Sequence, residues 1–518
     1  MPASLPGSAD MRIGVLGAGT MGAGIALTAL YAGHSVILAE AVPEALKRGR
    51  DYIAIHLARK DRNDALRLLQ LSNELSALAG SDVVIEAINE DLELKRTVFA
   101  ELDRLCPPPT ILASNTSTLS ITAIAAATQS PERVAGMHFF NPAPVMRLVE
   151  VARSAKTSQP TVEALVRLAE QMGKTAVVTL DTPGFIVNRV ARPFYGEALR
   201  LLAEQAAGHA AIDLLVTLGG GFPMGPFQLM DLIGLDVNLQ AAQSMYDSTY
   251  GEPRYRPQSI QRRYVESGRL GRKTGVGFYE YPEGEQYWPA PDVPEPGQQS
   301  GFVLISDGSW GPEVGRLLVQ AGYTLSETHG DFPLAALIVN GREEGVRDVL
   351  RRYDRGLAPE IPILCQTVDI AFSEVEQSVQ HAQRLIGFDG LFFAAGRAVT
   401  LVAPPDLPDT VRQAADTLVR SLGKLPVWVN ESPGLVLPRI VCCLANEAAF
   451  AVAEGVAAPE AVDTAMKLGV NYPKGPLEWA AALGYRKVVG VLDHLANEYG
   501  EERYRVAPWL RNRARRSQ

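Results

Sequence analysis

Arg12-Ile-Gly-Val-Leu-Gly-Ala-Gly-Thr-Met-Gly22 is the stretch that decides the fold of the first part of the chain. Residues Arg12–Leu16 predict a short buried strand, and the glycines after it have the G-x-G-x-x-G spacing at the start of a helical pattern. Between a strand and a helix, this spacing gives a tight turn, lets a pyrophosphate approach the backbone and offers it the helix N-terminus. We therefore expect a dinucleotide diphosphate to be bound by Gly17, Gly19, Thr20, Met21 and Gly22.

An acidic residue, Glu40, ends the next predicted strand, Ser35–Ala39. A carboxylate at this position accepts hydrogen bonds from the adenosine ribose hydroxyls. No arginine follows at once, which favours NAD over NADP. The competing interpretation is a glycine-rich turn without a ligand.

Short apolar runs alternate with helical patterns as far as about Thr179, as in a parallel sheet wound with helices on both faces. The runs expected as strands are Arg12–Leu16, Ser35–Ala39, Asp82–Ala87, Thr110–Ala113, Val134–Phe139 and Ala176–Thr179. From Pro183 to about Gly268, long Ala- and Leu-rich helical patterns replace them. The sequence therefore predicts an α/β Rossmann-type domain followed by an all-α domain.

The second half of the chain repeats the first. Gly173-Lys174 and Pro183-Gly184 recur 250 residues later as Gly423-Lys424 and Pro433-Gly434. Near the start of the two copies the offset is 289 residues, so about 39 residues are missing from the second copy. We expect five parts: an NAD-binding Rossmann-like domain (11–182), a helical domain (183–281), a linker (282–301), a degenerate Rossmann-like domain (302–430) and a second helical domain (431–518).

Two polar residues at strand ends form the candidate catalytic pair. His138 ends one apolar strand, and Glu150 ends a short strand expected over 146–150. Oxidation of a secondary alcohol needs a base for the hydroxyl proton, and imidazole suits that task. A carboxylate on the other ring nitrogen would fix the tautomer and stabilise the imidazolium. Taken alone, however, a histidine beside two phenylalanines is also a common core residue.

The complete set of motifs resembles the 3-hydroxyacyl-CoA dehydrogenase family. The resemblance runs from Met11 to about Tyr281, and its motifs are Gly-Ala-Gly-Thr-Met-Gly, Ser114-Asn-Thr-Ser-Thr118, His-Phe-Phe-Asn-Pro, Asp181-Thr-Pro-Gly-Phe-Ile-Val-Asn-Arg189 and Gly271-Arg-Lys-Thr-Gly-Val-Gly-Phe-Tyr279. Glu40 is a mild departure, because many members have Asp there.

This resemblance implies roles for individual residues. It makes His138 the base, Glu150 its carboxylate partner, and Ser117 and Asn188 polar contacts to the reacting part of the substrate. For the last two, helix capping by Ser117 and a helix-surface amide at Asn188 are the structural alternatives. It also places near the cofactor Glu90, Lys95, Asn115 and Asn141.

The resemblance further implies that a basic helical excursion covers the CoA moiety. The candidate cations are Lys47, Arg48, Arg50, Arg59, Lys60, Arg62 and Arg67. The alternative is an ordinary solvated helix face. Family members with one helical domain commonly dimerise through it, so we expect either a monomer with an internal pseudo-dimer or a homo-oligomer.

The second copy is expected to be inactive. Carrying the positions across places Phe388 at His138, Thr400 at Glu150 and Pro438 at Asn188. In its phosphate turn Ser306 replaces Gly17 although Gly308 and Gly311 remain, and His329 stands where an acid is needed. We therefore expect a structural role for the second half.

Composition narrows the function classes. A formal net charge of −9 over 518 residues argues against nucleic-acid binding, which needs clustered cations. The four cysteines show no metal-ligand spacing and predict buried thiols, and no metal site is expected. Without a signal peptide or a membrane-length apolar run, the expected location is the cytoplasm.

The expected reaction is therefore NAD-dependent oxidation of a (3S)-3-hydroxyacyl-CoA. The second half resembles the long, duplicated members that act on 3-hydroxyadipyl-CoA in phenylacetate breakdown. Alternatives are a 3-hydroxybutyryl-CoA or general β-oxidation dehydrogenase, a β-hydroxyacid dehydrogenase or imine reductase, and a crystallin-like protein that binds NAD without turnover.

Overall fold

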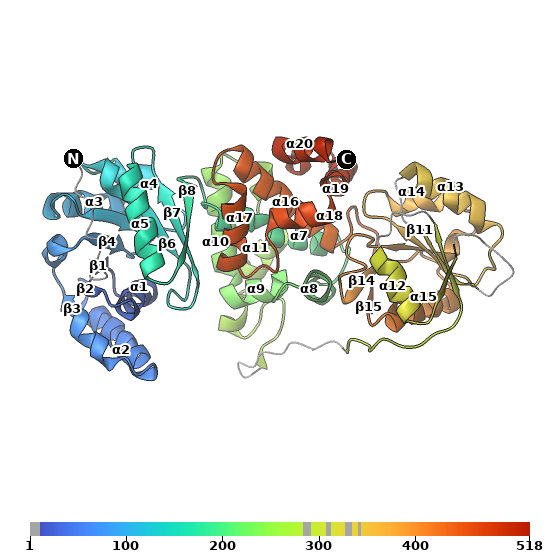
Figure 1. The fold of residues 1–518 in the computed structure, drawn as a ribbon, viewed down its shortest axis with the longest axis horizontal. Helices are drawn as coiled ribbons and strands as arrows, with labels where there is room; N and C mark the ends of the chain where they lie inside the picture. Colours follow the sequence, from blue (N-terminus) through green and yellow to red (C-terminus); the bar gives the residue numbers. More distant parts are fainter. Residues whose placement is uncertain (1–10, 283–291, 307–311, 327–333, 340–342, 518) are drawn as a thin grey trace. The chain divides into compact units, whose positions relative to one another are not determined.

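The computed structural model describes residues 11–282, 292–306, 312–326, 334–339 and 343–517 (Figure 1). The chain packs as two compact units. The first consists of Met1–Val190 together with Ala451–Gly475, and the second of Ala191–Phe450 together with Pro476–Gln518. We call Ala451–Gly475 the crossing segment, because it lies in the second half of the sequence but packs with the first unit. The five predicted domain boundaries stay a prediction.

An eight-stranded sheet organises the first unit, in the order β3-β2-β1-β4-β5-β6-β7-β8. Its strands are β1 (Arg12–Leu16), β2 (Ser35–Ala39), β3 (Leu69–Ser72), β4 (Val83–Glu86), β5 (Ile111–Ser114), β6 (Val134–Phe139), β7 (Leu148–Arg153) and β8 (Thr175–Leu180). β1 to β6 are parallel, β7 is antiparallel to β6, and β8 is parallel to β7. The predicted Rossmann-type sheet is confirmed. β3 is an additional edge strand, in which two leucines alternate with Gln70 and Ser72 and no residue is fully buried.

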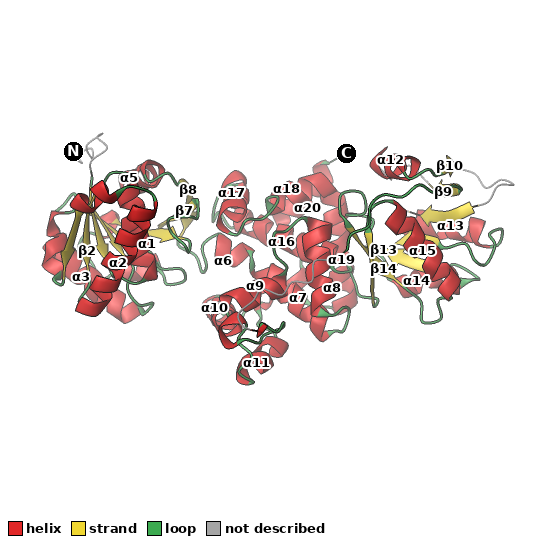
Figure 2. Cartoon of the chain, turned by 90° about the horizontal axis from the view of Figure 1, so that it is seen from below, coloured by secondary structure: helices red, strands yellow, loops and turns green. Residues whose placement is uncertain are grey.

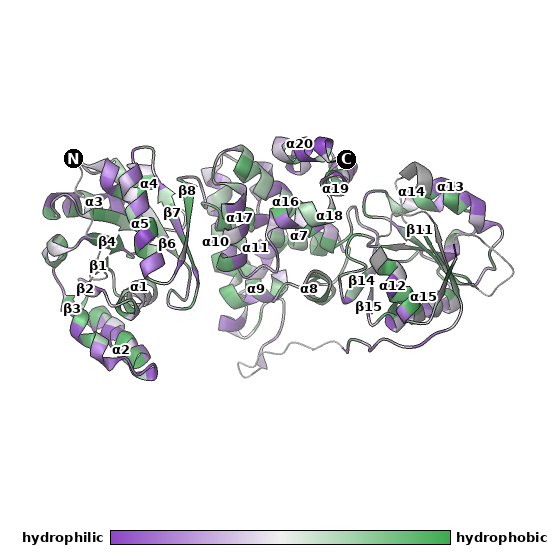
Figure 3. Ribbon diagram, viewed as in Figure 1, coloured by the Kyte–Doolittle hydropathy of each residue, from purple (hydrophilic) through white to green (hydrophobic). Residues whose placement is uncertain are grey.

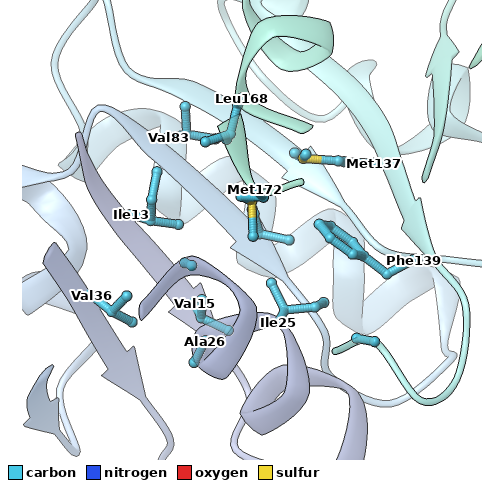
Figure 4. Packing of buried hydrophobic residues seen from close by; sticks show 14 of the residues in the cluster. Ile13, Val15, Ile25, Ala26, Val36, Val83, Met137, Phe139, Leu168 and Met172 are labelled. Carbon is cyan, nitrogen blue, oxygen red and sulfur yellow. The ribbon is translucent and has the colours of Figure 1, made fainter. Parts of the chain in front are cut away.

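Helices cover both faces of this sheet (Figure 2). On one face lie α1 (Thr20–Tyr31), α2 (Pro43–Arg59) and α5 (Gln159–Gln171), and on the other α3 (Leu92–Leu105) and α4 (Ile121–Ala125). Figure 4 shows the first core, where Ile13 and Val15 of β1 meet Ile25 of α1 and Met172 beyond α5. These packed layers fix the carboxyl ends of the strands, which carry the candidate site.

A seven-stranded sheet in the second unit repeats this topology without the β3 edge. Its order is β10-β9-β11-β12-β13-β14-β15, and among the strands described only β13 and β14 pair antiparallel. The strands are β9 (Phe302–Ser306), β10 (Thr324–Ser326), β11 (Leu334–Val339), β12 (Ile363–Gln366), β13 (Leu385–Phe388), β14 (Ala398–Val402) and β15 (Leu425–Val429). Their helices are α12 (Pro312–Gln320), α13 (Glu343–Asp354), α14 (Phe372–Glu376) and α15 (Asp409–Ser421). Between β10 and β11 lie the seven residues 327–333, where the first copy has 40–82, so the missing residues fall after the second strand as expected.

The structure corrects one position of the second copy. Gly387 packs against Phe372 and Val402 as Gly136 packs against Ile121 and Ala152, so these two glycines are equivalent. The residue two positions later is His138 in the first copy and Asp389 in the second. The prediction that Phe388 replaces His138 was therefore wrong by one residue, and Phe388 is a core residue instead. Of the other positions, Gly308, Gly311 and His329 lie outside the described residues.

Helices from both halves make up the rest of the second unit. They are α7 (Arg192–Ala203), α8 (His209–Leu214), η4 (Leu215–Gly219), α9 (Pro226–Ile233), α10 (Leu235–Ser248), α11 (Ser259–Glu266), α16 (Leu437–Ala453), α18 (Pro476–Leu483), α19 (Tyr485–Tyr499) and α20 (Pro508–Arg516). Arg439 of α16 is fully buried and forms ion pairs with Glu197 at 2.8 Å and Glu204 at 2.9 Å. Glu447 of α16 accepts hydrogen bonds from Arg254 and Tyr255 in return. The two helical regions are therefore joined by buried charges.

The distribution of hydrophobic and hydrophilic residues differs between the sheet strands and the covering helices (Figure 3). Central strands such as β1 and β2 consist mostly of apolar residues, whereas α2 carries hydrophilic residues along its length. The described helices include none with the length and hydropathy of a membrane span. All four cysteines are free and buried, as expected.

Candidate active site

The glycine turn after β1 has the geometry that a bound diphosphate needs. Gly17 has φ +102°, and a Cβ there would lie 2.6 Å from the Ala87 carbonyl oxygen, so neither the conformation nor the space suits another residue. Gly19 caps α1 without a side-chain hydrogen bond, and the space beside it is open. Thr20 is exposed and Met21 half-buried in the first turn of this helix. Open backbone amides at a helix N-terminus fit the NAD diphosphate.

Glu40 lies at the end of β2, as predicted, and its carboxylate braces the turn. Its Oε2 accepts from the amide of Ala18 at 3.1 Å, and its Oε1 accepts from Val42 at 3.0 Å. The side chain stays half-exposed. Each oxygen keeps a second lone pair for a ribose hydroxyl.

His138 and Glu150 form a buried pair across β6 and β7. They stand opposite each other in the antiparallel register, and Nδ1 of His138 lies 2.7 Å from Oε2 of Glu150. His138 is 5% exposed and Glu150 fully buried. The rings of Phe140 and Phe185 lie 4.6 Å and 6.0 Å from the imidazole. Because Nδ1 contacts Glu150, Nε2 is the ring nitrogen that could act as a base.

A tight turn before α6 (Val187–Val190) donates backbone hydrogen bonds to the second carboxylate oxygen of Glu150, Oε1. Gly184 and Phe185 both have positive φ, at +73° and +48°, so the chain reverses and directs its next two amides at the strand. The amides of Ile186 and Val187 each donate to Oε1 of Glu150 at 3.0 Å. Positive φ costs a non-glycine residue about 1 kcal/mol, which is compatible with a turn selected for this contact.

Glu90 organises the loop that carries Ser117. Its carboxylate accepts from Thr116 Oγ1 at 2.5 Å and from the amide of Ser117 at 3.0 Å. Burial alone would raise the pKa of Glu90, but the hydrogen bond from Thr116 and the charge of Lys95 lower it below its ordinary value. Ser120, not Ser117, caps α4, so capping does not occupy the Ser117 hydroxyl.

Lys95 lies in a buried charge cluster that the sequence reasoning only half identified. Its Nζ lies 2.5 Å from Glu86 and 3.3 Å from Glu90. Glu86, at the end of β4, also accepts from Ser114 Oγ at 2.6 Å. An acid ending a buried strand was the signal used for Glu40, and the same signal could have identified Glu86.

The three candidate asparagines differ in position. Asn115 accepts from the amide of Phe139 at 2.8 Å, which ties the Ser117 loop to the strand of His138. Asn141 is exposed at the start of the loop after β6. Asn188 is half-buried on α6, directly after the two amides that hold Glu150.

A basic cavity of about 400 Å³ lies in the same unit. Its lining includes four cations, Lys60, Arg62, Arg147 and Lys174. Burial lowers the pKa of Lys174 to about 8, and its Nζ donates to the carbonyls of Ala143 and Met146. Lys60 and Arg62 follow α2 and belong to the predicted basic excursion. Arg67 lies beyond α2, in the 3-10 helix η1 (Asn63–Leu68).

Comparison with known proteins decides the family. The family described as "3-hydroxyacyl-CoA dehydrogenase, NAD binding domain" matches residues 12–182. A 3-hydroxyadipyl-CoA dehydrogenase of Escherichia coli is 39% identical over 514 residues, which is 97% of each chain. The chain belongs to the 3-hydroxyacyl-CoA dehydrogenase family. It is an NAD-dependent oxidoreductase, as the sequence motifs predicted.

Other relatives agree on the family but differ in the acyl group of their names. A solved structure named 3-hydroxybutyryl-CoA dehydrogenase, also from Escherichia coli, has a TM-score of 0.79 at 38% identity and covers 97% of this chain and 98% of its own. A probable 3-hydroxybutyryl-CoA dehydrogenase of Bacillus subtilis is 46% identical over 281 residues, covering 52% of this chain and 98% of its own.

The family's C-terminal domain matches this dehydrogenase twice, at residues 184–281 and 434–518. The duplication of the helical domain, inferred from motifs 250 residues apart, is therefore confirmed. The second sheet with its parallel strands accompanies the second helical match.

Proposed function

We propose that His138 is the general base of this dehydrogenase and that Glu150 fixes its tautomer. The supporting observation is the 2.7 Å contact between Nδ1 and the fully buried carboxylate, whose other oxygen is held by two backbone amides. Nε2 then takes the hydroxyl proton, and Glu150 stabilises the imidazolium. Ser117 and Asn188 orient the alcohol and thioester oxygens. NAD, when bound, supplies the acceptor for the hydride that leaves C3.

The cofactor residues are proposed from the turn and its neighbours. Gly17, Gly19, Thr20, Met21 and Gly22 would hold the diphosphate, and Glu40 the ribose. Asn115 and Asn141 flank the strand of the base and would lie beside the nicotinamide end. Glu90 and Lys95 would support the cofactor site indirectly. They form an ion pair with each other, and Glu90 accepts a hydrogen bond from the amide of Ser117.

We infer that the basic cavity takes part of the CoA polyanion. Phosphate groups bind to clustered cationic side chains. The lining of this cavity includes Lys60, Arg62, Arg147 and Lys174. Arg147→Gln is expected to raise KM for every acyl-CoA by a similar factor, because the phosphates are common to all of them. A change confined to one acyl chain would contradict this assignment.

We propose 3-hydroxyadipyl-CoA, a dicarboxylate, as the preferred substrate. The observation that supports this substrate is the relative named for it, which is 39% identical over 97% of both chains. A distal carboxylate would need a cation at the acyl end of the site. Of two arginines near Asn188, Arg189 is ion-paired with Glu454 at 2.8 Å and Arg192 lies over the Tyr195 ring, so each already has a partner. The second candidate is 3-hydroxybutyryl-CoA, which the structural relative's name favours.

The test compares kcat/KM for 3-hydroxyadipyl-CoA, 3-hydroxybutyryl-CoA and 3-hydroxyhexanoyl-CoA at one moderate salt concentration. The dicarboxylate should be used most efficiently. A preference for the uncharged six-carbon chain would reject the dicarboxylate while leaving the dehydrogenase assignment intact.

We also propose that the chain works as a monomer with an internal pseudo-dimer, in the cytoplasm. Buried ion pairs between helices of the two halves support the pseudo-dimer. Sedimentation velocity should give a single species near 55.9 kDa, and a stable dimer would contradict it.

A further inference from the structure

The crossing segment packs on the edge of the first sheet, beside the candidate site. Its helix α17 (Pro459–Gly469) contacts β7, β8 and α6. The amide of Leu180 at the end of β8 donates to the Val456 carbonyl at 2.9 Å. Glu454 forms an ion pair with Arg189 at 2.8 Å, and the Arg189 side chain is only 6% exposed. Residues of the second half therefore complete the first unit.

These contacts converge on the residues that hold Glu150. A Cβ on Gly469 would lie 3.0 Å from Val187 Cγ2 and 2.8 Å from Leu148 Cδ2. Val187 donates its amide to Glu150, and Leu148 begins the strand that carries Glu150. Arg189, which Glu454 binds, follows Asn188 on the short helix α6. A helix of four residues has little stability of its own, so its position depends on such packing.

The second unit contains the same three contacts with the halves exchanged. Glu204 pairs with Arg439 at 2.9 Å, the amide of Asn430 donates to the Ala206 carbonyl at 2.8 Å, and a Cβ on Gly219 would lie 3.0 Å from Leu437. Each of these residues lies 250 positions from its counterpart in the first unit. In this copy, however, Thr400 stands where the first copy has Glu150. The contacts in the second unit are therefore an internal control for those in the first, because they have equivalent packing but do not adjoin a His–Glu pair.

We propose that the crossing segment positions the active site of the first half, and that Glu454 and Gly469 are positioning residues for Glu150 and Asn188. This inference rests on the catalytic roles proposed above for Glu150 and Asn188. Glu454 fixes α6 through the buried Arg189, and the absent side chain at Gly469 lets α17 approach Val187 and Leu148. The degenerate half is thus a working part of the single active site.

The test compares matched variants of the full chain, Glu454→Gln and Glu204→Gln. Both remove one carboxylate from equivalent ion pairs, so both should lower the melting temperature by a similar amount. Glu454→Gln should also lower kcat by about tenfold, because small misplacements of catalytic groups are costly. The Kd for NADH should be unchanged in both variants, since the glycine turn lies elsewhere. Glu204→Gln should keep kcat within about twofold of the original chain.

Hydrogen exchange supplies a readout that lost stability alone would not give. The amides of Ile186 and Val187 should exchange faster in Glu454→Gln than in Glu204→Gln when the two are compared at equal global stability. Gly469→Ala should reproduce the kcat loss, and Gly219→Ala should not.

Equal kcat in Glu454→Gln, Gly469→Ala and their matched controls would overturn the positioning role. If Glu150→Gln itself kept full activity, the proposed catalytic roles would fail first. The two failures are therefore distinguishable.

Discussion

At the scale of single residues, Glu150 is the point on which the geometry of the site converges. One oxygen contacts His138 and the other accepts two backbone amides from the turn before α6. A fully buried carboxylate is stable only when its lone pairs are satisfied in this way. The same contacts that make its burial possible also set the direction of the imidazole.

Glu150→Gln is expected to lower kcat by about two to three orders of magnitude, because an amide places a donor against Nδ1–H and leaves the imidazolium uncompensated. The loss should be smaller than that of His138→Gln, and NADH binding should be retained. Steady-state rates at 340 nm with acetoacetyl-CoA and NADH measure it. A loss larger than that of His138→Gln would mean that the two roles are reversed.

Glu40 should set the choice between cofactors. Its carboxylate would repel a 2′-phosphate, so kcat/KM should be at least about tenfold higher with NAD than with NADP. Glu40→Ala should narrow this ratio chiefly through a lower KM for NADP. Equal use of both cofactors by the unchanged chain would contradict the assignment of Glu40.

At the scale of helices and strands, sequence periodicity predicted most of the first sheet. Strands β1, β2 and β6 begin and end as predicted, because parallel strands buried on both faces have nearly continuous apolar sequences. β3 was missed because its residues Leu69–Ser72 are half-exposed at a sheet edge.

In the second copy, a single residue offset does not locate every equivalent position. Its strand β13 lies 251 residues after β6, whereas β14 lies 250 after β7, so a single offset misplaced Phe388 by one position. The crossing segment was also beyond sequence reasoning, since contacts between residues about 270 positions apart leave no local pattern.

The buried charges between α7 and α16 should make the second unit sensitive to acid. Burial alone would raise the pKa of Glu197, but the charges of Arg439, Arg503 and Arg200 lower it to about 2. A carboxylate whose folded pKa is depressed stabilises the fold above its ordinary pKa, and that contribution is lost as the pH falls through the folded value.

The free energy of unfolding should therefore drop between about pH 4.5 and pH 2, with a contribution from Glu197 on the order of 3 kcal/mol. Urea unfolding at several pH values measures this dependence. Glu197→Gln should be less stable at pH 7 and show a shallower acid limb. An unchanged limb in Glu197→Gln would show that other groups carry the pH dependence.

At the scale of the whole molecule, the chain contains two copies of the same fold, and the glycine motif, Glu40 and the His138–Glu150 pair all lie in the first copy. Only seven residues separate β10 from β11, so the basic excursion of the first copy has no room there. We expect one NADH per polypeptide, held at Gly17–Gly22 and Glu40. Isothermal titration calorimetry measures the ratio, and a value of two would contradict an inert second half.

The most direct test of a single working site compares kcat in two repeat-related variants, His138→Gln and Asp389→Asn, with acetoacetyl-CoA and NADH at 340 nm. His138→Gln should lose about three or more orders of magnitude, because the general base and its orienting bond are both removed. Asp389→Asn should keep kcat near that of the original chain, since the Asp389 carboxylate lies in the second sheet, where it accepts from the backbone amides of Leu391 and Phe392. NADH binding by both variants would show that each is folded. Near-normal turnover in His138→Gln, or a comparable loss in Asp389→Asn, would contradict the account.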